Sequence, residues 1–342
     1  MSDKMTITFW GVRGSYPMAG ASTVHYGGNT SCVEVSVAGH TIIFDAGTGI
    51  IALGKELARR SYESGVPIQA TLLFSHMHHD HTQGFPFFAP TRIPSAQLHI
   101  FGPDIYRRAP EEILVDMMTP PTFPVTFREL SSNRTVRSIR ETNVIRIARD
   151  TNGPIMERVT STNKPIQAQE DEVIIRIMRS YAHPGGVLFY RVEWQNRAIV
   201  YATDTEGYFA VDQRLVRFAQ RADLLIHDAQ YTEDHYLGLK PGYFSTQGWG
   251  HSTPSIACDV AEAAKVKQLA IFHYDPTYDD QTIAEIESRI RQRLPNAIAP
   301  YEGLKITLSG EQKPSYTTTA TSATKRPRKS LHLVATSLDH VR

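Results

Sequence analysis

Short apolar runs separated by polar and glycine-rich connections occur along most of the chain, and they predict a series of β-strands. In the N-terminal third we predict strands at Thr6–Trp10, Ser31–Val37, Thr41–Phe44, Ala70–Phe74 and Gln97–Phe101. After residue 170 we predict further strands at Val173–Met178, Val187–Trp194, Ala198–Tyr201, Leu224–Ile226, Gln268–Phe272 and Lys305–Leu308. Gly39 lies between the second and third of these runs and indicates a hairpin.

Helical periodicity occurs between some of these strands. Helices are predicted from Ile50 to about Arg60, over Pro254–Lys265 and over Asp280–Leu294. The last one carries Ile283, Ile286, Ile290 and Leu294 on one face, which is typical of a helix that packs against a sheet. Strands and helices together predict an α/β protein.

Two regions depart from this pattern. Between about residues 104 and 168 the periodicity loosens, and three prolines between Met117 and Val125 exclude a regular helix or central strand there. This segment is either an excursion that covers part of the protein or a surface loop. From residue 311 to 342 a Thr/Ser/Ala-rich stretch and the basic run Lys325–Lys329 predict a disordered tail after a domain of residues 1–310. We interpret the basic run as solvated, with a weak nucleic-acid or membrane contact as the alternative.

Composition narrows the function classes. With 342 residues, 41% of them hydrophobic, the chain can fill a large core, and its net charge of +1 gives no strong field for nucleic acid or membranes. Cys32 and Cys258 are the only two cysteines and lie outside any CxxC motif, which excludes a cysteine-ligated zinc and fits a reducing compartment. The first ten residues lack a signal-peptide pattern and no apolar run reaches membrane-spanning length. We therefore expect a cytoplasmic protein.

The strongest chemical motif follows the predicted strand Ala70–Phe74 and reads Ser75-His76-Met77-His78-His79-Asp80-His81. In an extended loop His76 and His78 point the same way, and Asp80 and His81 turn the other way as the next element begins. Such a loop can offer imidazoles to one metal ion and a carboxylate with an imidazole to another. This ligand set suits zinc, with manganese or iron as alternatives. A histidine-rich surface loop is the weaker interpretation.

Further ligand types follow other predicted strands. His183, Asp204 and His273 each come at or just after the end of a buried run. Alone, each would more often be a core, surface or turn residue. Open sheets gather ligands at strand ends, however, so their shared placement predicts that they meet the histidine motif at one edge.

These motifs and their order resemble the metallo-β-lactamase fold over residues 5–310. The resemblance implies a four-layer α/β/β/α sandwich with a dinuclear metal site at one edge. It further implies that His76, His78 and His183 bind one metal, that Asp80, His81 and His273 bind the other, and that Asp204 bridges them. Asp45, in Phe44-Asp45-Ala46-Gly47, matches the family aspartate that holds a ligand histidine.

Two more stretches are similar to the ribonuclease Z branch. Gly250-His251-Ser252-Thr253 resembles its Gly-His-Ser-Thr segment, and Ile226-His227-Asp228-Ala229 resembles its His-Glu-Ala segment with aspartate in place of glutamate. In that branch the histidine and the carboxylate act together at the departing oxygen, which gives His251 and Asp228 catalytic roles here. The basic substrate-gripping arm of ribonuclease Z is missing from this sequence, so a tRNA substrate is not favoured.

The favoured function is a hydrolase with a pair of divalent metal ions that cleaves a small or cyclic phosphodiester by attack of a metal-bridging hydroxide, with Asp80 orienting the nucleophile. A carboxyl-ester, thioester or lactone hydrolase is the alternative, and an RNA-processing nuclease is less favoured. Arg13 and Asn29, in two glycine-rich loops, are candidates for substrate binding, and a solvated loop residue is the equal alternative for Arg13. The family resemblance also suggests a homodimer.

Overall fold

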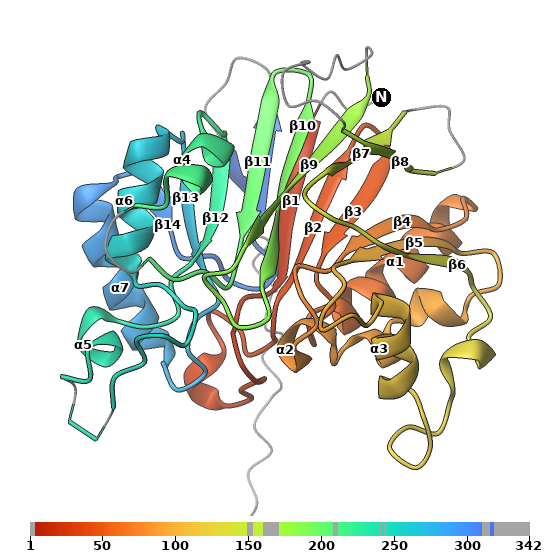
Figure 1. Ribbon diagram of the computed structural model, residues 1–342, viewed down its shortest axis with the longest axis horizontal. Helices are drawn as coiled ribbons and strands as arrows, with labels where there is room; N and C mark the ends of the chain where they lie inside the picture. Colours follow the sequence, from red (N-terminus) through yellow and green to blue (C-terminus); the bar gives the residue numbers. More distant parts are fainter. Residues whose placement is uncertain are drawn as a thin grey trace, which may run out of the picture.

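The computed structural model describes residues 4–148, 153–159, 171–207, 211–239, 241–242, 244–309 and 315–317. Two eight-stranded sheets lie face to face at its centre (Figure 1). The strands of the first sheet, in spatial order, are β16 (Ser315–Thr317), β15 (Lys305–Ser309), β1 (Lys4–Gly11), β2 (Cys32–Val37), β3 (His40–Phe44), β4 (Gln69–Leu73), β5 (Gln97–Gly102) and β6 (Asn133–Ser138). Those of the second are β14 (Ala297–Ile298), β13 (Leu269–Phe272), β12 (Leu224–Asp228), β11 (Arg197–Ala202), β10 (Val187–Trp194), β9 (Val173–Ser180), β7 (Asn143–Ile147) and β8 (Ile155–Arg158).

Helices cover the outer faces of both sheets (Figure 1). The described α-helices are α1 (Ile50–Ser64), α2 (His79–Thr82), α3 (Pro110–Met117), α4 (Gln213–Ala219), α5 (Glu233–Tyr236), α6 (Pro254–Ala264) and α7 (Asp280–Arg293). Short 3₁₀ turns occur at Ala21–Thr23, Phe85–Phe87, Ala89–Arg92 and Phe127–Glu129. Helix α1 packs Ile50, Leu53 and Leu57 into the apolar cluster outside the first sheet, and α4, α6 and α7 cover the second.

The space between the sheets is filled by apolar and aromatic side chains from both. Phe44 of β3 stacks on Tyr201 of β11, with ring centroids 4.8 Å apart and planes 3° from parallel. Both side chains are fully buried. The order helix, sheet, sheet, helix confirms the predicted four-layer α/β/β/α sandwich.

Strand direction explains where the functional residues meet. In the first sheet β3, β4 and β5 are parallel. In the second, β11, β12 and β13 are parallel, and β9 runs the same way because it is antiparallel to β10, which is antiparallel to β11. The carboxyl ends of β9, β11 and β13 therefore lie at one edge of the second sheet.

Residues 104–168 contribute to both sheets, which differs from the predicted excursion or surface loop. β6 extends the first sheet, β7 and β8 extend the second, and α3 precedes β6 along the chain. β6 was missed because its sequence, Asn-Arg-Thr-Val-Arg-Ser, is polar and its side chains are exposed or half-buried, as at many sheet edges. Residues 149–152 and 160–168 of this segment lie outside the described residues.

The C-terminal segment also differs in one place from the expected disordered tail. Ser315–Thr317 forms β16, which pairs antiparallel with β15 at the edge of the first sheet. Residues 311–314 and 318–342, including the basic run, lie outside the described residues. Within the described part of the chain no helix has the length and apolar character needed to cross a membrane.

Candidate metal centre

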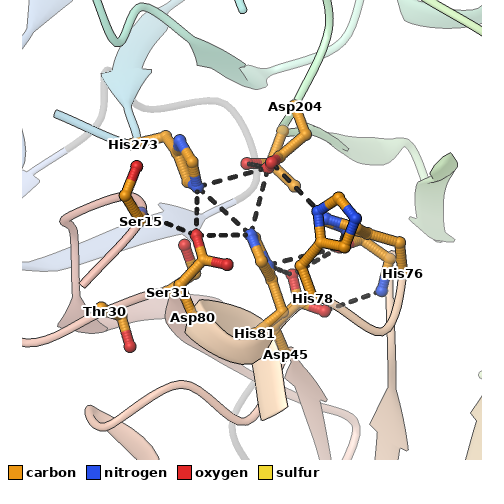
Figure 2. A network of polar contacts seen from close by, with 12 residues as sticks. Ser15, Thr30, Ser31, Asp45, His76, His78, Asp80, His81, Asp204 and His273 are labelled. Atoms are coloured by element: carbon orange, nitrogen blue, oxygen red, sulfur yellow. Dashed lines mark hydrogen bonds and ion pairs between the residues drawn. The ribbon is translucent and has the colours of Figure 1, made fainter. Parts of the chain in front are cut away.

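The sequence-predicted metal ligands meet at one edge of the sandwich, and loops from both sheets contribute (Figure 2). The loop after β4 presents His76 and His78, and α2 follows at once with Asp80 and His81. From the second sheet come His183 after β9, Asp204 after β11 and His273 after β13.

The side chains fall into two groups. The first group is His76, His78 and His183, and the second is Asp80, His81, Asp204 and His273. Within each group, one candidate ligand atom per residue lies within 4.8 Å of the others. In the first group, Nε2 of His183 lies 3.0 Å from Nδ1 of His78. In the second, Nε2 of His273 lies 3.1 Å from Oδ2 of Asp80.

Asp204 faces both groups. Its Oδ2 lies 3.6 Å from Nε2 of His76, and its Oδ1 lies 3.3 Å from Nε2 of His81 and 3.4 Å from Nε2 of His273. Figure 2 shows its carboxylate between the two sets of imidazoles. One carboxylate with an oxygen toward each group is the arrangement that a bridging ligand requires.

The donor set fits divalent metal ions. Nε2 of His76 is buried and has no hydrogen-bond partner among the described residues, although a buried polar atom normally has one. Imidazole nitrogens and carboxylate oxygens, with both cysteine thiols elsewhere in the core, suit zinc, manganese or iron. His79, which lies between His78 and Asp80 in the motif, is exposed and belongs to neither group.

Burial and charge set the protonation preferences of these histidines. Burial lowers the pKa of His76 well below its usual range and lowers that of His183 to about 4, so both favour the neutral form that binds metal. Burial also acts to lower the pKa of His81, but the Asp80, Asp204 and Asp45 carboxylates outweigh it and raise that pKa. The negative field that favours a proton on His81 also favours a divalent cation.

Asp45 lies behind the cluster at the end of β3. Its Oδ2 is 2.8 Å from Nδ1 of His81 and accepts from the hydroxyls of Ser75 and Tyr201, while its Oδ1 accepts from the Ser75 backbone N–H. Asp45 is fully buried. These contacts direct Nε2 of His81 toward Asp80 and Asp204.

His251 and Asp228 form a buried pair beside both groups. Nδ1 of His251 lies 2.8 Å from Oδ2 of Asp228, and the His251 ring is 5.0 Å from that of His183 and 5.1 Å from that of His273. Burial acts to lower the pKa of His251, but the charge and hydrogen bond of Asp228 outweigh burial and raise it to about 9. The Asp228 carboxylate therefore favours the protonated form of this imidazole. One donor atom each of His251, His183 and Asp204 also lie within 4.8 Å of one another, so the geometry would allow His251 to bind a metal ion as well.

Arg13 and Asn29 are not brought into the cluster, in contrast to the substrate-binding expectation. The fully buried Arg13 guanidinium donates to the backbone carbonyls of Gly27, Asp275 and Tyr278 and so connects its own loop to two others. The Asn29 side chain donates to Glu302. Both residues sit in loops near the site, but their side chains have structural partners elsewhere.

Some residues at the site were not identified from the sequence. The side-chain oxygen of Gln230 lies 2.9 Å from Nδ1 of His273, and the Ser15 backbone N–H donates to Oδ2 of Asp80. Gly14 leaves room for His273, since an added Cβ would lie 2.4 Å from that ring. A signal for Gln230 existed, because it follows the β12 strand end two residues after Asp228.

The family model of the beta-lactamase superfamily domain matches residues 40–274, more than half of the chain. The chain therefore belongs to the metallo-β-lactamase superfamily, as its motifs indicated, and membership implies divalent metal binding. Within the superfamily it lies in the ribonuclease Z-like branch and is a metal-dependent hydrolase.

Similar proteins agree with this assignment. Ribonuclease Z of Thermococcus kodakarensis is 27% identical over 291 residues, which cover 78% of this chain and 85% of that protein. Ribonuclease Z of Haloarcula marismortui is 27% identical over 295 residues, which cover 80% of this chain and 87% of that protein. The crystal structure of the metallo-beta-lactamase fold protein YhfI from Bacillus subtilis superposes with a TM-score of 0.57 at 17% identity, covering 90% of this chain and all of that one. This last likeness concerns the fold alone.

Proposed function

We propose that the protein is a phosphodiesterase that hydrolyses a small or cyclic phosphodiester. The observation that carries the proposal is the His251–Asp228 pair, 2.8 Å apart and beside both ligand groups. Hydrolysis of a phosphodiester releases a poor leaving group, an alkoxide, and a positioned acid assists its departure. A carboxylate behind the imidazole keeps the acid protonated and oriented.

The proposed ligands follow the two groups. His76, His78 and His183 would hold one divalent ion, Asp80, His81 and His273 would hold the other, and Asp204 would contact both. Zinc is the proposed metal, with manganese and iron as alternatives. Asp45 would orient His81 through its Nδ1 atom.

The residues of the chain have separate roles in the proposed reaction. When bound, the divalent ions would lower the pKa of a water nucleophile and neutralise charge on the phosphate oxygens. Asp80, whose Oδ2 also accepts from the Ser15 backbone N–H, would orient that nucleophile. His251 would donate its proton to the leaving oxygen, and Asp228 would stabilise the imidazolium and fix its ring.

RNA cleavage is the second candidate, and the similarity to ribonuclease Z favours it. Against it, the sequence lacks a basic substrate-gripping arm of the ribonuclease Z type. An ester, thioester or lactone hydrolase would use the same metals but would not need the His251–Asp228 pair.

A substrate panel tests the proposal. Protein purified without chelator is assayed with added zinc, manganese or neither on bis-p-nitrophenyl phosphate, cyclic nucleotides, a 3′-extended structured RNA, a thioester and a lactone. We expect turnover of the first two classes. Efficient cleavage of the RNA with little activity on the small diesters would favour the nuclease, and activity only on the thioester or lactone would overturn the phosphodiesterase.

A further inference from the structure

Glu206 is a buried carboxylate outside the proposed ligand set. It lies two residues after Asp204 in the loop that follows β11, and its side chain is 3% exposed. Among the described residues it forms no ion pair with a lysine or arginine. A buried charge of this kind is costly unless hydrogen bonds satisfy it.

Three donors satisfy this carboxylate. Its Oε1 accepts from the Tyr236 hydroxyl at 2.6 Å and from the Gly248 backbone N–H at 2.7 Å, and its Oε2 accepts from the Gly250 backbone N–H at 2.8 Å. Two of the three belong to the turn that immediately precedes His251. Glu206 therefore fixes this turn from the loop that carries Asp204.

The turn in question contacts a proposed metal ligand. The Gly250 carbonyl lies 3.2 Å from Nδ1 of His183 and is the acceptor for that ring nitrogen. Gly250 has φ of +89°, and an added Cβ would lie 2.4 Å from the same nitrogen, so the backbone and the imidazole are in close contact. A shift of Gly250 would rotate or displace the His183 ring, whose Nε2 faces His78.

We infer that Glu206 is a positioning residue of the metal centre. Its carboxylate holds the turn at Gly248 and Gly250. This turn positions the His183 ring and the adjacent His251. The inference rests on the proposed function for the roles of His183 and His251. Acceptors that orient ligand histidines are worth about ten- to a hundredfold in metal affinity.

Glu206→Gln tests the inference because the change is nearly isosteric. A glutamine oxygen can still accept from Gly248 and Tyr236, but its amide nitrogen would then face the Gly250 N–H, so the contact to Gly250 is lost. We expect zinc affinity, measured by competition with a chromophoric chelator, to fall about tenfold or more. We also expect kcat to fall with little change in KM, and the loss to be larger on an alkyl phosphodiester than on a p-nitrophenyl one, because His251 is misplaced too.

Matched variants separate positioning from stability. Glu233→Gln makes the same change at a carboxylate outside the ligand groups, whose Oε1 accepts from the Ser255 backbone N–H. The amide oxygen can keep that contact, so zinc affinity should be unchanged. Tyr236→Phe removes one donor but leaves both turn contacts of Glu206, so a small effect is expected. Equal losses of affinity in the Glu206 and Glu233 variants, or wild-type affinity in Glu206→Gln, would overturn the inference.

The variant His183→Ala shows whether a negative result counts against the positioning role of Glu206 or against the proposed ligand assignment. If it binds zinc like the wild type, the ligand assignment itself is wrong. If it loses zinc while Glu206→Gln does not, only the positioning role fails. Should Glu206→Gln not fold, Glu206→Asp keeps the charge but shortens the side chain, and it should lower zinc affinity. Failure of both to fold where Glu233→Gln folds would assign Glu206 to general stability and overturn the positioning role.

Discussion

The backbone N–H of Asp204 donates to Oδ2 of Asp228 at 3.1 Å, the oxygen that also lies 2.8 Å from Nδ1 of His251. The other oxygen of Asp228 accepts from the Ser252 backbone N–H at 2.8 Å. One buried carboxylate therefore links the residue that faces both ligand groups with the proposed acid. A substitution of Asp228 should therefore affect the positions of both Asp204 and His251.

Removing the proposed acid should slow turnover according to the leaving group. His251→Ala is expected to lower turnover of an alkyl phosphodiester about a hundred- to ten-thousandfold and that of a p-nitrophenyl diester much less, because nitrophenolate needs little protonation. Asp228→Asn should give a smaller loss in the same direction, and the double variant should be little worse than His251→Ala. Steady-state rates on both substrates check this.

Metal content of the same variants separates two roles of His251. An intact metal content with reduced turnover supports the acid. Loss of metal would instead make His251 a ligand. Its donor atom lies within 4.8 Å of those of His183 and Asp204, which allows this role.

The metal centre itself should hold about two divalent ions per chain, because its seven donors form two groups around one shared carboxylate. Elemental analysis of protein purified without chelator measures this number. Treatment with chelator should abolish turnover, and added zinc or manganese should restore it. Fewer than one ion per chain after reconstitution would contradict the ligand assignment.

Asp45→Asn should weaken metal binding without removing a proposed ligand. The amide can no longer accept from Ser75, Tyr201 and His81 together, so His81 loses its fixed orientation. Zinc affinity should fall about ten- to a hundredfold. Tyr201→Phe is the control, since it removes one donor from the carboxylate and should cost only about 1 kcal/mol of unfolding free energy. Similar zinc affinity in both variants would argue against the orienting role.

Two C-terminal truncations test where the proposed hydrolase domain ends. Ending the chain after residue 317 should leave melting temperature, metal content and turnover unchanged, because the Thr/Ser-rich and basic composition beyond it cannot support a core. Ending it after residue 310 also removes β16 and exposes the edge of β15. We expect a loss of about 1 kcal/mol for the second truncation, seen as a fall of roughly 2 °C in Tm. Aggregation or inactivity after the first truncation would assign the tail to the domain.

The central strands were predictable because they are buried runs. β4, β9, β11 and β13 were found to within about two residues, and the shared edge of the ligands at their ends followed from strand direction. β6 and β16 could not be found in this way. They are sheet edges whose pairing depends on neighbours distant in the chain rather than on their own polar sequence.

Side-chain direction was harder to predict than position. Arg13 lies in the expected loop, but its guanidinium donates to the backbone carbonyls of residues 27, 275 and 278. These carbonyls come close to Arg13 only in the tertiary structure, so the sequence does not reveal them as its partners. Glu206 looks like an ordinary loop glutamate in the sequence for the same reason. Its partners lie about 30 to 44 residues further along the chain.

The division of the cluster between the two sheets has a consequence for how the protein is made. The loop after β4 supplies His76, His78, Asp80 and His81 early in synthesis, whereas His183, Asp204 and His273 follow only when the second sheet is translated. Neither half alone contains a complete ligand group. A nascent chain would therefore acquire its divalent ions only after the ligand-bearing strands of both sheets have been made and have docked, so metal binding would come late in folding.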